Sequence, residues 1–189
     1  MAESKDNLAT EGLSGQVGNF VFRRRRRDGK VFVSRRPGER ETEPTLAQQA
    51  VNTKFQLATI YGKTVISDPD TKAEYQARTK GGQSAYNVAV ADYFGAPDIE
   101  AVDLDSYGGQ IGDPIRVKVT DNFGVESVSV RIENGDGTLV EEGNAVVDQT
   151  GLYWDYAATV LNDSLSGDKI TVTATDRPQN TTSEETVLP

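Results

Sequence analysis

The second half of the chain alternates apolar and polar residues with a period of two, the pattern of strands that are buried on one face. The alternation is clear at 115–119, 128–132, 154–158 and 170–174, and Gly, Asn and Asp residues typical of turns separate these segments. The pattern predicts about seven strands in roughly 90 residues, a spacing typical of a two-sheet β-sandwich. The residues expected to form its core are Val117, Val119, Val128, Val130, Trp154, Ile170 and Val172.

The first half contains two β-prone segments, at 17–26 and 31–36, on either side of Asp28-Gly29. Such a pair favours a two-residue type I′ turn, because both central positions of that turn need positive φ. We therefore expect a hairpin in which Arg24 faces Val33. Both faces of this ribbon mix arginine with apolar residues, and a two-stranded ribbon is marginal in water. The ribbon should therefore project from the protein or become ordered by docking.

A long amphipathic helix is expected after the hairpin. Thr45 is a candidate N-cap, with Gln48 three residues later to complete a capping box, and the helical pattern continues to about Lys63. The apolar residues at spacings of three and four are Leu46, Ala47, Ala50, Val51, Leu57, Ala58 and Tyr61.

Two shorter helices should follow. Asp68-Pro69 is typical of a cap followed by proline in the first turn, and Ser84 precedes a segment of small apolar residues that ends at Gly95. The sequence thus predicts a flexible N-terminus at 1–14 and a basic α+β module at 15–96, which consists of a β-hairpin and about three helices. An acidic all-β sandwich at 97–189 completes the predicted fold.

Two segments of the second half, 115–132 and 169–182, resemble bacterial immunoglobulin-like domains. The pattern V-x-D-x-x-G-V-x-x-V-x-V of that family is matched by Asp121, Gly124, Val125, Val128 and Val130. Its later pattern A-x-D-x-x-G-N is matched by Ala174, Asp176 and Asn180, with Gln179 in place of glycine. The resemblance covers about half of the chain and implies an immunoglobulin-like sandwich. Such domains serve as spacers, adhesin modules and particle decorations, so the resemblance implies no single function.

The first half resembles uncharacterised bacterial and phage-borne modules, which implies no site. The residues that carry this resemblance are Gly15, Gly18, Asn19, the arginine-rich hairpin, Thr45, Ala47 and Gln48.

The chain contains no cysteine and no histidine. Disulfides, thiolate metal sites, ordinary zinc sites and His-based catalysis are therefore excluded. Carboxylate pairs such as Asp103/Asp105 and Glu141/Glu142 remain, but surface acids are common in so acidic a domain, so we expect neither an enzyme nor a cofactor. A structural calcium ion is the alternative, and its candidate ligands are Asp103, Asp105, Asp121, Asp136, Asp163, Asp168 and Asp176.

Charge is divided unevenly along the chain. Residues 1–96 hold 15 Lys and Arg against 11 Asp and Glu, and residues 97–189 hold 5 against 18, giving net charges of +4 and −13. Such a molecule can associate head to tail, or the two modules simply differ in charge. Positive charge is densest at 20–40, where the basic cluster consists of Arg23, Arg24, Arg25, Arg26, Arg27, Lys30, Arg35 and Arg36.

This basic cluster has three interpretations. It docks onto acidic protein, such as the second domain of another copy. Alternatively it binds nucleic acid, because a β-ribbon fits the major groove and arginine contacts phosphate and guanine. The third interpretation is a solvated edge that discourages strand pairing. We favour docking, because the acidic domain would oppose a polyanion.

The expected function is therefore that of a non-enzymatic structural protein. It would dock through its basic module and display or stack the immunoglobulin-like domain, either self-assembling or decorating a phage-like or injection-machine particle. A nucleic-acid-binding protein whose acidic domain recruits partners is the alternative.

Residues 1–10 lack the apolar core of a signal peptide, and no stretch of the chain approaches 18 apolar residues. We therefore expect synthesis in the cytoplasm without membrane insertion, and a final location there, in a virion or in another particle.

Overall fold

The computed structural model describes residues 2–4, 13–25, 29–39 and 42–189. The chain divides into two compact units, residues 1–53 and 54–189. The division falls within the long helix α1, and each unit is described by itself.

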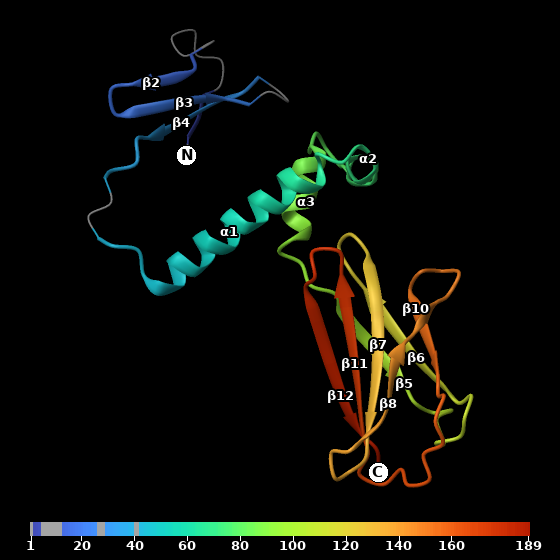
Figure 1. Ribbon diagram of the computed structural model, residues 1–189. Helices are drawn as coiled ribbons and strands as arrows, with labels where there is room; N and C mark the ends of the chain where they lie inside the picture. The colour runs from blue at the N-terminus through green and yellow to red at the C-terminus, as the bar shows by residue number, and fades with distance from the viewer. Residues whose placement is uncertain (1, 5–12, 26–28, 40–41) are drawn as a thin grey trace. The chain divides into compact units, whose positions relative to one another are not determined.

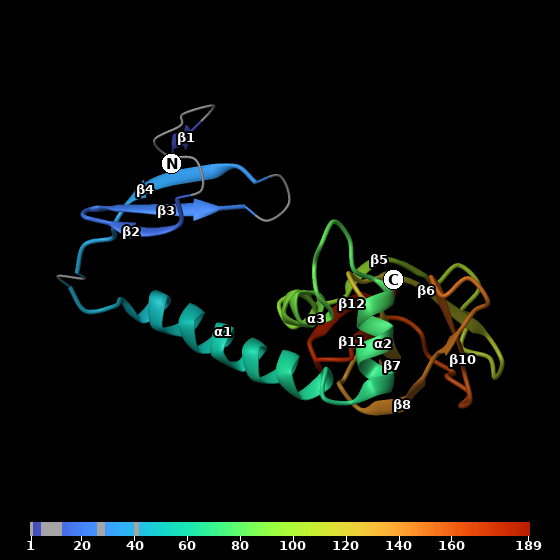
Figure 2. The ribbon, with the colours of Figure 1, turned by 90° about the horizontal axis from the view of Figure 1, so that it is seen from above.

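The first unit contains a four-stranded antiparallel sheet with the order β1-β4-β3-β2 (Figure 2). Its strands are β1 (Ala2–Ser4), β2 (Gly15–Val17), β3 (Phe20–Arg24) and β4 (Val31–Arg35). The prediction of a two-stranded ribbon is therefore wrong in strand number. The continuous strand expected at 17–26 is interrupted by a turn at Gly18-Asn19, where Val17 pairs with Phe20. Gly18 has a φ of 55°, which glycine adopts without steric cost.

The central hairpin is confirmed, but its predicted register is wrong. Arg24 lies opposite Val31 rather than Val33, and the amide of Arg25 donates to the carbonyl of Lys30 over 2.9 Å. Arg25 thus faces Lys30, and the predicted two-residue turn at Asp28-Gly29 is wrong. Gly29 has the positive φ of 69° that was expected, while Asp28, Arg26 and Arg27 lie outside the described residues. Because the shift is by two residues, each described side chain of the hairpin keeps its predicted face.

The three predicted helices are present as α1 (Leu46–Val65), α2 (Pro69–Ala77) and α3 (Ala85–Asp92) (Figure 1). The predicted capping box closes α1, because Oγ1 of Thr45 accepts from the amide of Gln48 and Oε1 of Gln48 accepts from the amide of Thr45. Asp68 and Ser84 cap α2 and α3 through their side-chain oxygens. None of the described helices has the length and hydropathy needed to cross a bilayer.

The second unit contains two four-stranded antiparallel sheets, with the orders β5-β6-β10-β9 and β12-β11-β7-β8. The first sheet comprises β5 (Asp98–Asp103), β6 (Pro114–Thr120), β9 (Val146–Val147) and β10 (Tyr153–Ala157). The second comprises β7 (Val125–Glu133), β8 (Leu139–Asn144), β11 (Lys169–Asp176) and β12 (Thr181–Val187). Residues 97–189 thus form eight strands, close to the number of about seven that the pattern predicts.

One hydrophobic core lies between these two sheets. It contains residues of β6 and β10 from one sheet and of β7 and β11 from the other. All seven residues that the alternation predicts for the core are buried. The most exposed of them is Trp154, with 7% of its surface accessible. Because burying a valine or isoleucine side chain contributes roughly 1.5–3 kcal/mol, this core accounts for the stability of the sandwich.

The helices pack against one end of the sandwich. Phe123, in the β6–β7 loop, joins Tyr75 of α2 and Ala85 and Ala89 of α3 in a second hydrophobic cluster. The side-chain amide of Asn180, in the β11–β12 loop, donates to the carbonyl of Gly95 over 2.8 Å. The domain boundary predicted at residue 96 therefore lies inside the second unit.

The β11–β12 turn contains a testable strain. Gln179 has a φ of 69° and is the only described non-glycine residue with positive φ, at the position where the immunoglobulin-like pattern has glycine. A side chain in this conformation costs about 1–2 kcal/mol. We expect Gln179→Gly to be about 1 kcal/mol more stable than Gln179→Ala, because both lose the same side-chain hydrogen bonds and glycine alone relieves the strain. Urea unfolding followed by Trp154 fluorescence measures the difference, and equal midpoints would contradict it.

Candidate docking surfaces

Neither face of the sheet in the first unit forms a core. Val31 is the only buried apolar residue among the described residues of this unit, at 7% exposure. Val17 and Phe20, on the same face, are 57% and 49% exposed. A four-stranded sheet normally gains its stability by burying one face. The apolar side chains of this sheet are therefore available to another surface.

Arginines border these apolar residues on both faces. The register places Arg24 and Arg35 on the face of Phe20 and Phe22, and Arg23 on the opposite face. On that opposite face the guanidinium of Arg25 lies over the ring of Phe32, 5.1 Å from its centre, a cation–π contact that aligns a charge with an apolar group.

The described part of the predicted basic cluster is exposed. Within the described residues, the guanidinium groups of Arg23, Arg24, Arg35 and Arg36 form no ion pair. The structure therefore brings six of the eight predicted residues to the two faces and edges of one sheet: Arg23, Arg24, Arg25, Lys30, Arg35 and Arg36. Arg26 and Arg27 lie outside the described residues.

The carboxylate pairs considered for catalysis do not act together in the structure. Glu141 is buried and accepts hydrogen bonds from the Tyr156 hydroxyl and the Thr159 amide, each over 2.8 Å, whereas Glu142 points outward to Arg131 at 2.7 Å. Burial raises the pKa of Glu141, but the hydrogen bonds from Thr159 and Tyr156 outweigh it and hold the pKa below its ordinary value. Glu141 therefore ties β8 to β10.

Two of the other acids considered as ligands or catalysts, Asp103 and Asp168, have local structural partners. Asp103 caps a turn by accepting from the amide of Asp105 over 3.0 Å. Asp168 accepts from the side-chain amide of Asn162 over 2.7 Å and from the amide of Gly135 over 3.1 Å. Across the residues that the structure describes, no three acidic side chains come together as a metal site would require.

A polar cluster that the sequence did not indicate lies where the helices meet the sandwich. The hydroxyl of Tyr75, which is fully buried, donates to Oδ2 of Asp92 over 2.6 Å. The hydroxyl of Tyr61 lies 2.8 Å from that of Tyr75. These three residues come from α1, α2 and α3, so one chain of hydrogen bonds ties the three helices together. Helix caps fix where each helix starts, but nothing local in the sequence shows which faces meet.

Asp92 is buried at a cost that this hydrogen bond does not fully offset. Its side chain is 2% exposed, and Oδ1 has no hydrogen-bond partner. Burial, and then the negative charges of Asp121 and Asp176, raises the pKa of Asp92 to about 6, against the opposing effect of the Tyr75 hydroxyl. The pKa of Asp176 is raised as well, chiefly by burial. The junction therefore holds two carboxyl groups that bind a proton more readily than an exposed aspartate does.

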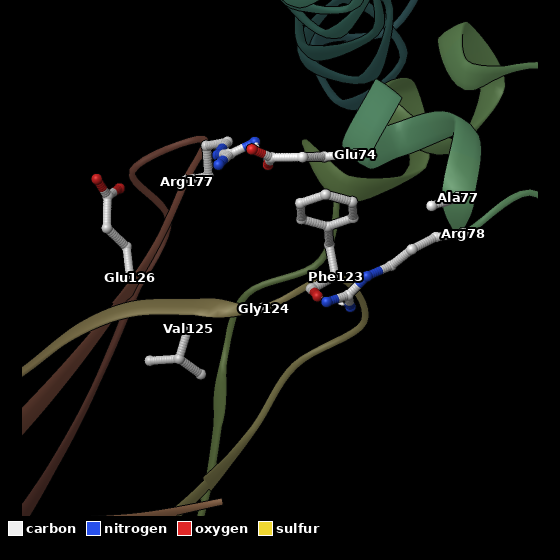
Figure 3. A pocket seen from close by; sticks show the side chains of 8 residues that line it. All are labelled: Glu74, Ala77, Arg78, Phe123, Gly124, Val125, Glu126 and Arg177. Carbon is white, nitrogen blue, oxygen red and sulfur yellow. Dashed lines mark hydrogen bonds and ion pairs between the residues drawn. The ribbon is translucent and has the colours of Figure 1, made fainter. Parts of the chain in front are cut away.

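Next to this cluster, α2 and the β6–β7 loop enclose an open pocket of about 450 Å³ (Figure 3). Two guanidinium groups face the ring of Phe123, at 4.6 Å for Arg78 and 5.6 Å for Arg177. Arg78 also donates to the carbonyl of Phe123, and Arg177 pairs with Glu74 at 2.6 Å. With Glu126 also in the lining, its positive and negative charges balance. The residues of the pocket therefore mainly connect α2 to the loops of the sandwich. Because its charges balance, the pocket has little preference for a cation or an anion.

Comparison with known proteins identifies no family. No family model matches the chain, and no curated protein matches it. An engineered protein of known structure is 24% identical over 41% of this chain and 15% of its own, with a TM-score of 0.32. The pullulanase SAP of Group B Streptococcus is 16% identical over 39% of this chain and 10% of its own, with a TM-score of 0.29. The match spans a small part of both proteins, and similarity this low carries no argument.

The raised pKa of Asp92 predicts how the second unit responds to pH. Because its folded-state pKa of about 6 exceeds the ordinary 3.8, the folded protein binds the proton more tightly than the unfolded chain does. The contribution of Asp92 to the free energy of unfolding is therefore most favourable below about pH 4 and falls as pH rises through 6. Asp92→Asn removes this dependence. We expect its stability relative to wild type to be greater at pH 7.5 than at pH 4.5 by about 2 kcal/mol.

Thermal and urea unfolding at the two pH values measure this difference. Asp70→Asn, which removes an exposed carboxylate from the first turn of α2, is the matched control and should show nearly the same difference from wild type at both. If Asp92→Asn behaved like Asp70→Asn, the buried carboxyl would not be the source of the pH dependence.

Proposed function

We propose that this protein is a non-enzymatic assembly protein, in which the sheet of the first unit docks onto an acidic protein surface and the sandwich is displayed or stacked. One observation carries the proposal. The sheet leaves Val17 and Phe20 about half exposed, beside Arg24 and Arg35, which form no ion pair with any described residue. Its described part has a single buried apolar residue. Exposed aromatic residues flanked by arginine are the composition of a protein-binding surface.

The proposal includes an immunoglobulin-like assignment for the sandwich. Its support is the strand order, because β5-β6-β10-β9 and β12-β11-β7-β8 correspond to strands A-B-E-D and G-F-C-C′ of that fold. The matched sequence patterns add support, since Gln179 adopts the positive φ that glycine at its position would favour. Sandwiches of this kind serve as spacers and displayed modules, which fits a structural role.

The partner best matched on charge is an acidic protein surface, and the chain contains one. Residues 97–189 carry a net charge of −13. Their few cations are largely paired, as Lys118 is with Glu100 at 2.5 Å and Arg116 with Asp155 at 3.4 Å. We propose that the sheet docks onto this acidic half of a neighbouring copy, either in a free polymer or on a larger particle such as a phage-like or injection-machine assembly.

Nucleic acid is the second candidate partner. The observation that favours it is the exposure of arginines on both faces of the sheet, because arginine can contact phosphates in the groove that a β-ribbon enters. The negative charge of the second half opposes it. The two candidate partners can be distinguished with one arginine variant, which should lose either self-association or nucleic-acid binding.

Removing arginines from the sheet tests the proposed function. In the triple variant Arg23→Ser, Arg24→Ser, Arg35→Ser, we expect association beyond a dimer at about 50 mM salt to be lost. In wild type, the same association should weaken steeply toward about 500 mM salt, because salt screens contacts between exposed charges. Sedimentation velocity of the full chain measures both effects. The control Lys63→Ser, Lys72→Ser, Lys80→Ser removes the same charge from exposed lysines of the second unit and should leave association unchanged.

A gel-shift assay with the same proteins covers the alternative partner. Retardation of DNA or RNA at low salt that only the arginine variant loses, without salt-sensitive self-association of wild type, would replace protein docking with nucleic-acid binding. If the arginine variant matched the lysine control in both assays, the sheet would not be a docking surface.

A further inference from the structure

Helix α1 has two apolar faces, and only the C-terminal part of one of them is covered. There Ala58 and Gly62 are buried, and a Cβ added at Gly62 would meet the side chain of Val90 of α3 at 2.9 Å. These small residues allow the two helices to approach closely. Val51 and Phe55, on the same face nearer the start of the helix, remain 65% and 55% exposed. Leu57 and Ile60 lie on the other side of the helix, roughly 100° or more around its axis, and are 48% and 61% exposed. The single apolar stripe expected from the sequence is therefore two stripes.

The uncovered face has the spacing of a coiled-coil seam. Its positions repeat at alternating intervals of four and three residues along the whole helix, which keeps them on one side over five turns. All of them are exposed, and Leu46 reaches 83%. These positions, which we call the α1 seam, are Leu46, Ala50, Thr53, Leu57, Ile60 and Thr64.

The composition of α1 restricts what can cover this seam. Its 20 residues include no acid and two cations, Lys54 and Lys63, whereas the outer face of a helix that stays in water is normally polar and charged. Neither lysine belongs to the seam. A partner rich in acids would find few cations to pair with, and one rich in apolar residues and poor in charge fits better. Another α1 has this composition.

The seam is complementary to itself when two copies run antiparallel. Its large and small residues then face one another in every layer, because Leu46 lies opposite Thr64, Ala50 opposite Ile60, and Thr53 opposite Leu57. Each layer combines one bulky and one small side chain, so the layers have similar volumes and can pack without voids. A parallel pair would instead place alanine on alanine and leucine on leucine. The antiparallel pair is isologous, and it closes at two copies.

The available area is sufficient for a stable dimer. The exposed fractions of the α1 seam correspond to on the order of 400 Å² of apolar surface per copy, close to the apolar share of the ~800 Å² that each partner contributes to an interface of standard size. An exposed apolar patch of this extent on a soluble protein marks an interaction site.

We propose that α1 binds the α1 of a second copy, antiparallel, through the α1 seam. This contact is separate from the docking of the basic sheet, because it uses another surface and depends on apolar burial rather than on charge. At about 500 mM salt the sheet contacts are screened and the α1 dimer persists. The two proposals therefore fail independently.

Measuring the mass of the full chain at high salt tests the dimer. Sedimentation equilibrium in about 500 mM salt should give a dimer for wild type at tens of micromolar protein, and a monomer for Leu57→Glu, which buries a charge in the seam. Asn52→Glu is the matched control, since it adds the same charge to an exposed position of α1 outside the seam, and it should remain a dimer. Circular dichroism confirms that both variants are folded. A monomeric wild type, or equal masses for the two variants, would overturn the proposal.

Cysteine cross-linking tests the orientation, and the chain has no cysteine of its own. The double variant Ala50→Cys, Ile60→Cys should form a covalent dimer on oxidation, because each cysteine faces its counterpart in the partner. The single variants should not, since their cysteines lie about 15 Å apart across the dimer. Cross-linking of either single variant would establish a parallel pair and reject the antiparallel one, and no cross-linking of the double variant would reject the seam.

Discussion

The proposed contacts depend on one constraint, which is that an extended apolar face left uncovered by its own chain favours contact with another surface. In the described residues, every buried apolar side chain except Val31 lies between Ala58 and Ala174. The second unit thus contains both hydrophobic clusters and can account for its own stability. The first unit combines four short strands with exposed Phe20 and Val17, and nothing in its described part supplies the missing core. In the proposed assembly, a partner surface covers these side chains.

The junction of helices and sandwich determines which part of the chain behaves as a rigid body. The Tyr61, Tyr75 and Asp92 hydrogen bonds link the three helices, and Phe123 between two guanidinium groups links α2 to the sandwich. A buried carboxylate with one unpartnered oxygen is an expensive way to join two elements. It also makes the arrangement specific, because only one packing of α3 brings Asp92 to the Tyr75 hydroxyl. The exposed face of α1 is consequently held in a fixed orientation on the sandwich from Lys54 onward.

The fold follows from the sequence where local rules decide it. Caps at Thr45, Asp68 and Ser84 fix the helix starts, and the alternation in the second half identifies the core because a strand has only two faces. Errors arose where backbone conformation overrode the pattern. Gly18-Asn19 turns the chain inside a segment that looks like one strand, and the arginine hairpin uses a longer loop than its Asp-Gly pair suggests. The two faces of α1 were merged, since apolar residues on both sides give one broad stripe in the sequence.

The candidate sites also differ in whether local sequence or tertiary packing determines them. The basic cluster is a property of composition, so the sequence locates it, and the described part of the sheet displays it on both faces. The Tyr75–Asp92 junction and the α1 seam depend on which helix faces meet, and that is decided by tertiary contacts such as the close approach of α3 at Gly62. The sequence contains a heptad spacing at Leu46, Ala50, Leu57 and Ile60. Only the burial of Ala58 and Gly62 on another side of the helix shows that these four residues are not part of the hydrophobic core.

The two proposed contacts also differ in symmetry, and together they suggest an architecture. Pairing of identical helices is isologous and ends at two copies. A basic sheet that binds the acidic half of another copy is heterologous, and it leaves a free sheet at one end of the chain and a free acidic surface at the other. A dimer joined through α1 would carry two of each. Each dimer can therefore contact up to four neighbours, so growth would produce a branched or layered assembly rather than a single strand. Ionic strength acts on the propagating contact alone, because apolar burial in the α1 seam is insensitive to screening. Salt therefore separates the building block from the assembly, and the physical difference between the two surfaces is what makes that separation possible.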